Sequence, residues 1–174
     1  MTYEKIIKFH GHECPGIAIG YRMAQAALSE LAALRAEDEE LVAIVENDAC
    51  GVDAVQCLTG CTFGKGNLVF HDYGKNVYTF YSRESKIGVR VSFNSQHAPL
   101  HLRESRDAFT QWILSAPANE MLTLKRVFME APERAKIRKS VACAFCGESV
   151  METRVRNCQG KPACIPCSAG RDAG

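Results

Sequence analysis

Long uncharged runs are absent from the sequence. Its longest stretches without a charged residue, 91–102 and 108–119, have 12 residues each, whereas a membrane-spanning helix needs about 20 apolar residues. Residues 1–5 also lack the basic and then apolar order with which a signal peptide begins. We therefore expect a cytoplasmic protein that makes no contact with a membrane.

A strong charge of one sign is also absent. The 21 Lys and Arg residues face 20 Asp and Glu residues, which gives a net charge of +1 at pH 7. Residues 131–174 are more basic, with 8 basic and 4 acidic side chains, but four thiolates around a Zn²⁺ ion would add a formal charge of −2 there. Nucleic acid is therefore not the partner that we expect.

The remaining composition is that of a globular protein, with 47% hydrophobic and 24% charged residues and no internal repeat. Apolar periodicity and turn residues predict helices and strands in mixed order. The expected helices are 15–35, 49–59, 101–115 and 118–125, although 124–129 could equally be extended, and the expected strands are 41–46, 67–73, 76–83 and 88–94, the last three as an antiparallel meander. This order predicts an α+β fold, with a mixed or antiparallel sheet and packed helices.

Cysteine is the residue in excess, because the chain contains nine. In a cytoplasmic protein, dense cysteine indicates metal binding or catalysis more often than disulfides. The cysteines form an early group, Cys14, Cys50, Cys57 and Cys61, and a late group, Cys143, Cys146, Cys158, Cys164 and Cys167. This division predicts a core domain at 1–139 and a second domain at 140–174.

The late group has the spacing of a structural zinc site. Cys143 and Cys146 form one two-residue-spaced pair, and Cys164 and Cys167 form another. Each pair can place two sulfurs of one short turn on a single tetrahedral ion, and four thiolates leave no position open for substrate. A small hairpin is expected over 150–155 with 160–161, and Cys158 is expected to be an ordinary half-buried cysteine. The strings CAFCGE and GKPACIPC resemble the treble-clef fingers of the DksA/TraR type.

The early group begins with two histidines and a cysteine in five residues: His10, His12 and Cys14. Pro15 predicts that a helix begins directly after Cys14. The positive end of that helix would favour the Cys14 thiolate. If the preceding segment is extended, His10 and His12 share one side. The three residues are candidate metal ligands.

The second expected helix carries Cys50, Asp53, Cys57 and Cys61 at spacings of 3, 4 and 4, so they share one face. Cys50 lies in the expected first turn, which should lower its pKa. The alternative is a row of small cysteines buried against the sheet, and for Cys57 we favour that alternative. Candidate catalytic residues are Cys14, Cys50, Asp53 and Lys65, the last because its ammonium could stabilise a Cys61 thiolate or an anionic ligand. The glycine-rich segment around Lys65 lacks the spacing of a phosphate-binding loop.

Three motifs, FHGHECPGIAIGYRMA, NDACGVDAVQCLTGCTFGKGNL and DYGKNVYTFYSR, together resemble the family of the E subunit of formylmethanofuran dehydrogenase. The resemblance extends from about residue 6 to residue 140. It implies an α+β core, a homodimer, and association with the other subunits of the tungsten or molybdenum enzyme that fixes CO₂ onto methanofuran in the one-carbon metabolism of methanogens. Members of the family often carry a carboxy-terminal zinc finger. The chain has no Rossmann fingerprint or ferredoxin spacing, so neither a pterin nor a nucleotide is expected to bind to it.

The leading hypothesis is an accessory protein of this family, part of an oxidoreductase complex and without complete catalytic machinery of its own. Its core would hold a second transition metal, most simply zinc, on His12, Cys14 and Cys61, with His10 and Cys50 in reserve. One alternative is a metal-free thiol protein, in which Cys14 pairs with Cys61 or Cys50 for redox or group-carrier chemistry. Another is a regulator whose zinc finger binds nucleic acid or a polymerase.

Overall fold

The computed structural model describes residues 1–32 and 35–169, apart from the side chain of residue 103. The chain divides into two compact units, Met1–Ala135 and Lys136–Gly174. Each unit is described here by itself.

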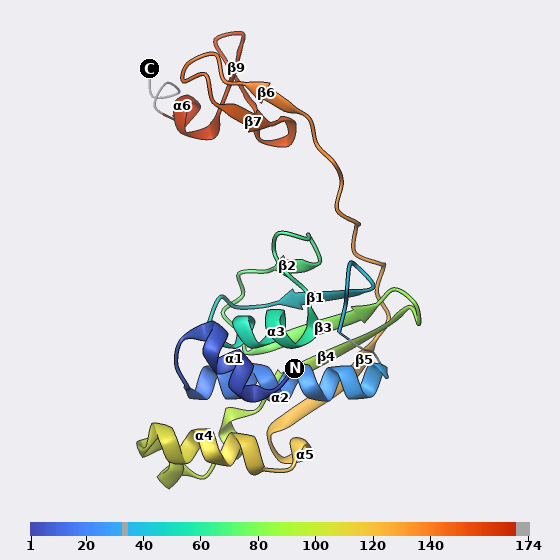
Figure 1. Cartoon of the computed structure of the whole chain (residues 1–174), viewed down its shortest axis with the longest axis vertical. Coiled ribbons are helices and arrows are strands. Elements are labelled where there is room, and N and C mark those ends of the chain that lie inside the picture. The colour runs from blue at the N-terminus through green and yellow to red at the C-terminus, as the bar shows by residue number, and fades with distance from the viewer. Residues whose placement is uncertain (33–34, 170–174) are drawn as a thin grey trace. The chain divides into compact units, whose positions relative to one another are not determined.

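The first unit is built around a five-stranded sheet (Figure 1). Its strands are β1 (Leu41–Val45), β2 (Leu68–Phe70), β3 (Val77–Ser82), β4 (Ile87–Phe93) and β5 (Leu122–Val127). They lie in the order β2-β1-β3-β4-β5. β1 pairs with β2 in parallel, and every other neighbouring pair is antiparallel. The sheet is therefore mixed.

Helices surround this sheet and pack mainly against one another and against β3 and β4. They are α1 (Tyr3–His10), α2 (Pro15–Leu31), α3 (Gly51–Thr59), α4 (Arg106–Ser115) and α5 (Ala118–Met121), with 3-10 turns at Ser95–His97 and Leu100–Glu104. The long helix α2 contacts α3, α4 and both central strands (Figure 1). The predicted α+β fold, with a mixed sheet and packed helices, is thereby confirmed. After α5 the chain is extended as β5, which settles the ambiguity over 124–129.

Alternate strand residues make the core, as expected from the two-residue period of a strand. Ala43 and Val45 of β1 pair with Phe80 and Tyr78 of β3, and all four are almost completely buried in one cluster. Residues of α2, including Met23, lie in the same cluster. The core of this unit therefore lies between the sheet and α2.

The expected antiparallel meander is wrong in its first strand. β2 does not pair with β3; Leu68 lies beside Ala43 in a parallel pair with β1, and α3 is the crossover between the two strands. Asn67 explains this placement. Its fully buried side chain donates to the carbonyl oxygens of Leu41 and Asp38, both at 3.0 Å, and its own carbonyl accepts from the Ala43 N–H at 2.9 Å. These bonds hold the start of β2 against β1.

The segment before Cys14 is helical, whereas we considered an extended one. Tyr3, Ile6, Ile7 and His10 have the spacing of a helix face, and Ile6 is completely buried. α1 ends at Gly11, whose φ of 97° is in the left-handed region that glycine tolerates best. The chain therefore turns sharply between α1 and α2.

The second unit consists of two hairpins and a short helix. β6 (Ser140–Ala142) pairs with β7 (Ser149–Met151), and β8 (Arg156–Cys158) pairs with β9 (Lys161–Ala163). A 3-10 turn, Glu152–Arg154, joins the hairpins, and α6 (Ile165–Ala169) follows them. The hairpin expected over 150–155 is therefore misplaced, because its first part belongs to β7. Cys158 is buried rather than half-buried.

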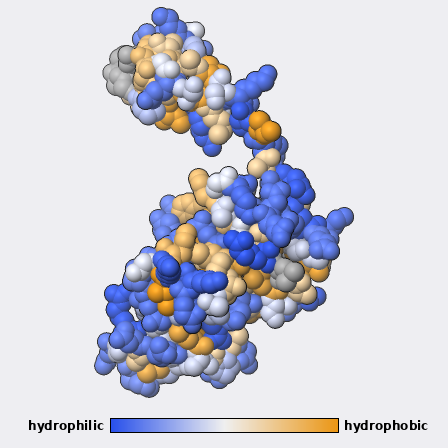
Figure 2. Space-filling model, in the orientation of Figure 1, coloured by the Kyte–Doolittle hydropathy of each residue, from blue (hydrophilic) through white to orange (hydrophobic). Residues whose placement is uncertain are grey.

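No helix in the described part of the chain is both long enough and apolar enough to span a membrane. On the face drawn in Figure 2, hydrophilic and apolar residues are intermixed over the surface.

Candidate metal centres

One candidate centre in the first unit consists of His10, Cys14 and Cys50. One ligand atom of each residue lies within 4.8 Å of the others. Cys14 is buried, and His10 and Cys50 are partly buried. Two sulfurs and an imidazole nitrogen at this separation form a donor set of the kind that binds transition metals.

The turn between α1 and α2 places His10 beside Cys14. Gly11 ends α1 with its N–H donated to the Ile7 carbonyl at 2.8 Å. Cys14 is extended and occupies the N-cap of α2, and Pro15 begins that helix. The histidine at the end of one helix and the cysteine before the next are therefore fixed by helix signals in the sequence.

Cys50 occupies the N-cap of α3, and Asn47 orders the loop before it. The Asn47 side-chain oxygen accepts from the Ala49 N–H at 3.1 Å and from the Tyr78 hydroxyl at 3.4 Å. Its amide group donates to the Lys75 carbonyl at 2.6 Å. Asn47 thus links the start of α3 to the sheet, and with it the position of Cys50.

Gly16 keeps the space between the two cysteines open. A Cβ atom at this position would lie 3.0 Å from Cys50 Cβ, 3.7 Å from Cys50 Sγ and 3.8 Å from Cys14 Sγ. The absence of a side chain at Gly16 therefore lets the first turn of α2 approach both sulfur atoms.

His10 is held on one of its two nitrogens only. Nδ1 lies 2.7 Å from Asp53 Oδ2, whereas Nε2 is buried and has no hydrogen-bond partner within the described residues. Buried polar atoms are almost always partnered in native proteins. A buried nitrogen without a partner, next to two thiols, is an observation that favours a missing metal ion.

The pKa of Cys50 is raised above its ordinary value, and not lowered as its helix position led us to expect. Burial of the thiol is the main cause, and the neighbouring Cys14 adds to it. Two adjacent thiols in a site with little solvent disfavour each other's ionisation. A divalent cation would reverse this balance, because thiolates are the metal-binding form.

Other candidate residues lie outside the His10, Cys14 and Cys50 group. His12 is exposed, and its ring centroid is 4.5 Å from that of His10. Cys61 is completely buried in the main core and donates to the Leu41 carbonyl at 3.4 Å; burial raises its pKa to about 11. The Lys65 ammonium donates to the carbonyls of Glu37 and Asp38 at 3.2 and 3.1 Å. The structure thus brings together our two reserve ligands, His10 and Cys50, with Cys14, and leaves the preferred Cys61 elsewhere.

A helical signal could have indicated this arrangement. The spacing of Tyr3, Ile6 and His10 predicts a helix that carries His10 at its end, close to the turn before Cys14. Cys57, one helical turn beyond Asp53, also lies outside the group, and burial of its thiol raises its pKa.

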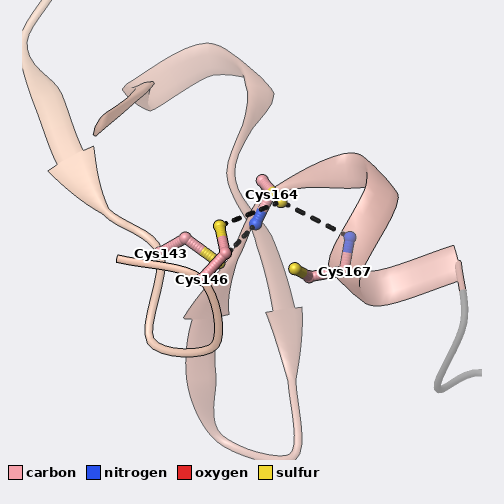
Figure 3. A group of neighbouring side chains, drawn as sticks. All are labelled: Cys143, Cys146, Cys164 and Cys167. Atoms are coloured by element: carbon pink, nitrogen blue, oxygen red, sulfur yellow. Dashed lines mark hydrogen bonds between the residues drawn. The ribbon is translucent and has the colours of Figure 1, made fainter. Parts of the chain in front are cut away.

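The second candidate centre consists of Cys143, Cys146, Cys164 and Cys167 (Figure 3). One sulfur of each lies within 4.8 Å of the others, and Cys146 Sγ is 3.9 Å from Cys164 Sγ. The first pair lies on the turn between β6 and β7, and the second pair lies at the start of α6. Two elements far apart in the sequence therefore present four sulfurs to one point.

Backbone N–H groups surround these sulfurs. The N–H of Cys164 donates to Cys143 Sγ at 3.3 Å, and the N–H of Cys167 donates to Cys164 Sγ at 3.4 Å. Such donors lower the pKa of Cys143 to about 6, whereas the adjacent Cys164 thiol raises that of Cys167 to about 12. One thiol ionises easily, and crowding prevents the rest from following without a cation. The four residues could bind a metal.

Two cavities lie away from both centres. One, of about 620 Å³, is lined by residues near the end of α2 and the β3–β4 turn, including Arg35, Glu40 and Ser85. The other, of about 500 Å³, is lined by 93–97 and Thr123. Neither contains a residue of the two cysteine groups.

Comparison with known proteins gives three matches. The family model described as FmdE, molybdenum formylmethanofuran dehydrogenase operon, matches residues 9–137. A curated relative from Archaeoglobus fulgidus, named a probable S-adenosyl-L-methionine-binding protein, is 31% identical over 189 aligned residues, which are 92% of this chain and 50% of the relative. The chain therefore spans about half the length of that relative. A crystal structure of a protein from Syntrophus aciditrophicus, described as like the FmdE component of tungsten formylmethanofuran dehydrogenase, is 30% identical, covers 96% of this chain and 90% of its own, and superposes with a TM-score of 0.73.

Proposed function

The chain belongs to the FmdE family, and on this premise we propose that it is an accessory metal-binding protein whose core holds one transition-metal ion on His10, Cys14 and Cys50. The observation that carries the proposal is the buried, unpartnered Nε2 of His10 beside two thiols. The resemblance seen in the sequence and the family match support the relation to formylmethanofuran dehydrogenase.

Zinc is the ion that this donor set fits best. Two thiolates and an imidazole are typical zinc ligands, and a site with three protein ligands keeps a fourth position for water or substrate. An ion held in this way would supply Lewis-acid chemistry at that position. The chain's own contribution is to place His10 and the two sulfurs and to keep Gly16 free of a side chain.

The second unit is proposed to hold a structural zinc ion on Cys143, Cys146, Cys164 and Cys167. A hairpin turn and the start of a helix each supply two sulfurs, which supports the treble-clef arrangement expected from the sequence. Four protein ligands would leave the ion closed to substrate. The role proposed for this ion is to fold the unit.

The partners that we propose are other subunits of a molybdenum or tungsten dehydrogenase complex, together with a second copy of the chain as a homodimer. The family description names the molybdenum formylmethanofuran dehydrogenase operon, and products of one operon commonly assemble. Co-purification of the full chain with the products of neighbouring genes would test this assignment.

Metal content per chain tests the core site. The full-length protein, purified without a metal-binding tag, is analysed by inductively coupled plasma mass spectrometry next to Cys14→Ser and Cys57→Ser. We expect two metal ions in the wild type, one in Cys14→Ser and two in Cys57→Ser. Cys57 is the matched control because it is a partly buried cysteine on the same helix as Cys50 but outside the donor group. One ion in the wild type would overturn the core site.

The closeness of Cys14 and Cys50 also favours a second candidate, a metal-free redox pair. In that case the two thiols would lose two electrons and two protons to an oxidant such as diamide and form one disulfide. The wild type would then contain one metal ion, and peptide mapping after diamide treatment would join Cys14 to Cys50. Two metal ions that protect both thiols from diamide would exclude this candidate.

A further inference from the structure

We propose that Asp53 is a positioning residue of the core metal site and acts through His10. This inference rests on the proposed function. It assigns a place outside the donor set to a residue that the sequence suggested as catalytic.

The contact between Asp53 and His10 determines which imidazole nitrogen is free. Asp53 Oδ2 lies 2.7 Å from His10 Nδ1, and a carboxylate can only accept a hydrogen bond. Nδ1 therefore carries the proton, and Nε2 carries the lone pair. Nε2 is the buried atom without a partner, so the tautomer selected by Asp53 is the one that can bind a metal.

The second carboxylate oxygen of Asp53 is also engaged. Gln56 Nε2 donates to Asp53 Oδ1 at 3.4 Å, which restricts rotation of the carboxylate. Histidine ligands of metals usually donate their other nitrogen to such a group, and its loss typically lowers metal affinity 10- to 100-fold. Asp53 has the contacts of that outer group.

Helix α3 presents the direct and the outer residue on one face. Cys50 and Asp53 are three positions apart, which makes their side chains neighbours. The sulfur of Cys50 and the carboxylate that orients His10 are thus fixed by the same helical turn. His10, from α1, is held between an outer group and a direct ligand of a single element.

The test compares Asp53→Ala and Asp53→Asn with the wild type in the full-length chain. Zn²⁺ affinity is measured by competition with a chromophoric chelator, and Cys14→Ser supplies the signal of the finger site alone. We expect Asp53→Ala to raise the Kd of the core site by about 10- to 100-fold. Asp53→Asn should raise it less, because the amide oxygen still accepts from Nδ1. Glu30→Ala is the matched control, since its carboxylate is as exposed as that of Asp53, at 37%, and also forms an ion pair, with Arg126.

A second measurement reports the tautomer directly. Long-range ¹H–¹⁵N spectra of the metal-free chain should show the His10 proton on Nδ1 in the wild type and in Asp53→Asn, and on Nε2 to a larger extent in Asp53→Ala. A folded Asp53→Ala protein that binds the second Zn²⁺ as tightly as the wild type would overturn the inference alone. So would a wild-type His10 protonated on Nε2. A wild type that binds one ion would overturn the proposed function as well.

Discussion

Gly20 and Gly51 lie at the point where helices α2 and α3 come closest. A Cβ atom on Gly20 would overlap the backbone carbonyl group of Gly51. A Cβ atom on Gly51 would lie 2.5 Å from the Tyr78 hydroxyl and 3.0 Å from the Gly16 carbonyl oxygen. The two helices that begin after Cys14 and Cys50 can therefore pack this closely only because both residues lack a side chain.

Gly20→Ala is expected to lower the free energy of unfolding by about 3 kcal/mol, because the new methyl group meets backbone atoms that cannot rotate away. Gly64→Ala is the control, since a Cβ atom there has no neighbour within 4 Å, and its effect should stay within about 0.5 kcal/mol. Urea unfolding followed by the fluorescence of the single tryptophan, Trp112, measures both. Equal midpoints for the two variants would contradict the close packing of α2 and α3.

At the same scale, the sequence identified the right kinds of ligand but not the right set. His10, Cys14 and Cys50 were all candidates, because helix-end cysteines and paired histidines are local signals. Cys61 was preferred over Cys50, although the two belong to opposite ends of α3. Only the long-range packing that buries Cys61 against Leu41 and turns Cys50 toward Cys14 separates them, and no local pattern contains that packing.

At the scale of elements, α2 and α4 are joined by a partly buried guanidinium group. Arg22 of α2 donates to the carbonyl oxygens of Ile113 and Leu114 at 2.7 and 2.6 Å, and to that of Ala116 at 2.8 Å. The last carbonyls of a helix have no partner within it, and a cation there also interacts favourably with the helix dipole. Burial lowers the pKa of Arg22. Arg22 therefore closes the carboxy-terminal end of α4 against α2.

Arg22→Met keeps the aliphatic stem and removes the guanidinium group. We expect it to lower the free energy of unfolding by about 2 to 4 kcal/mol, because three partly buried carbonyl groups lose a charged donor. Arg126→Met serves as the control. Its side chain is 63% exposed and pairs with Glu30 at 2.8 Å, so a loss of about 0 to 1 kcal/mol is expected. Thermal unfolding by circular dichroism compares the two; equal losses would show that Arg22 does not hold α4.

Most elements of the first unit were predictable, because periodicity and turn residues are local. α2, β1, α3 and the β3–β4 hairpin lie close to the ranges expected from the sequence. The pairing of β2 was not, because the segment has the same alternation whether it joins β1 or β3. The side chain of Asn67, which bonds across 26 residues to Leu41, decides the matter. The helix α1 was missed because it has only eight residues, too few for an apolar period to repeat clearly.

On the scale of the whole molecule, the two units differ in what can hold them together. The Met1–Ala135 unit has a continuous core between sheet and helices. The Lys136–Gly174 unit is smaller than about 40 residues, a size at which metals or disulfides are usually needed for folding. All nine cysteines are free thiols, so disulfides do not supply this stability. The second unit should therefore depend on its metal ion, and the first should not.

Removal of metal from the full-length chain is expected to unfold the second unit alone. In ¹H–¹⁵N spectra recorded with excess of a high-affinity Zn²⁺ chelator, the amide signals of 140–169 should collapse to random-coil positions. Those of the first unit should stay dispersed and change only near His10, Cys14 and Cys50, because its apolar core remains. Cys143→Ser should give the same collapse without chelator, since one lost thiolate opens the four-ligand site. Cys14→Ser should leave 140–169 ordered, and added Zn²⁺ should restore the chelated wild type. Dispersed signals from 140–169 in the metal-free chain would mean that the hairpins and α6 pack stably by themselves, and that the four cysteines are not what folds this unit.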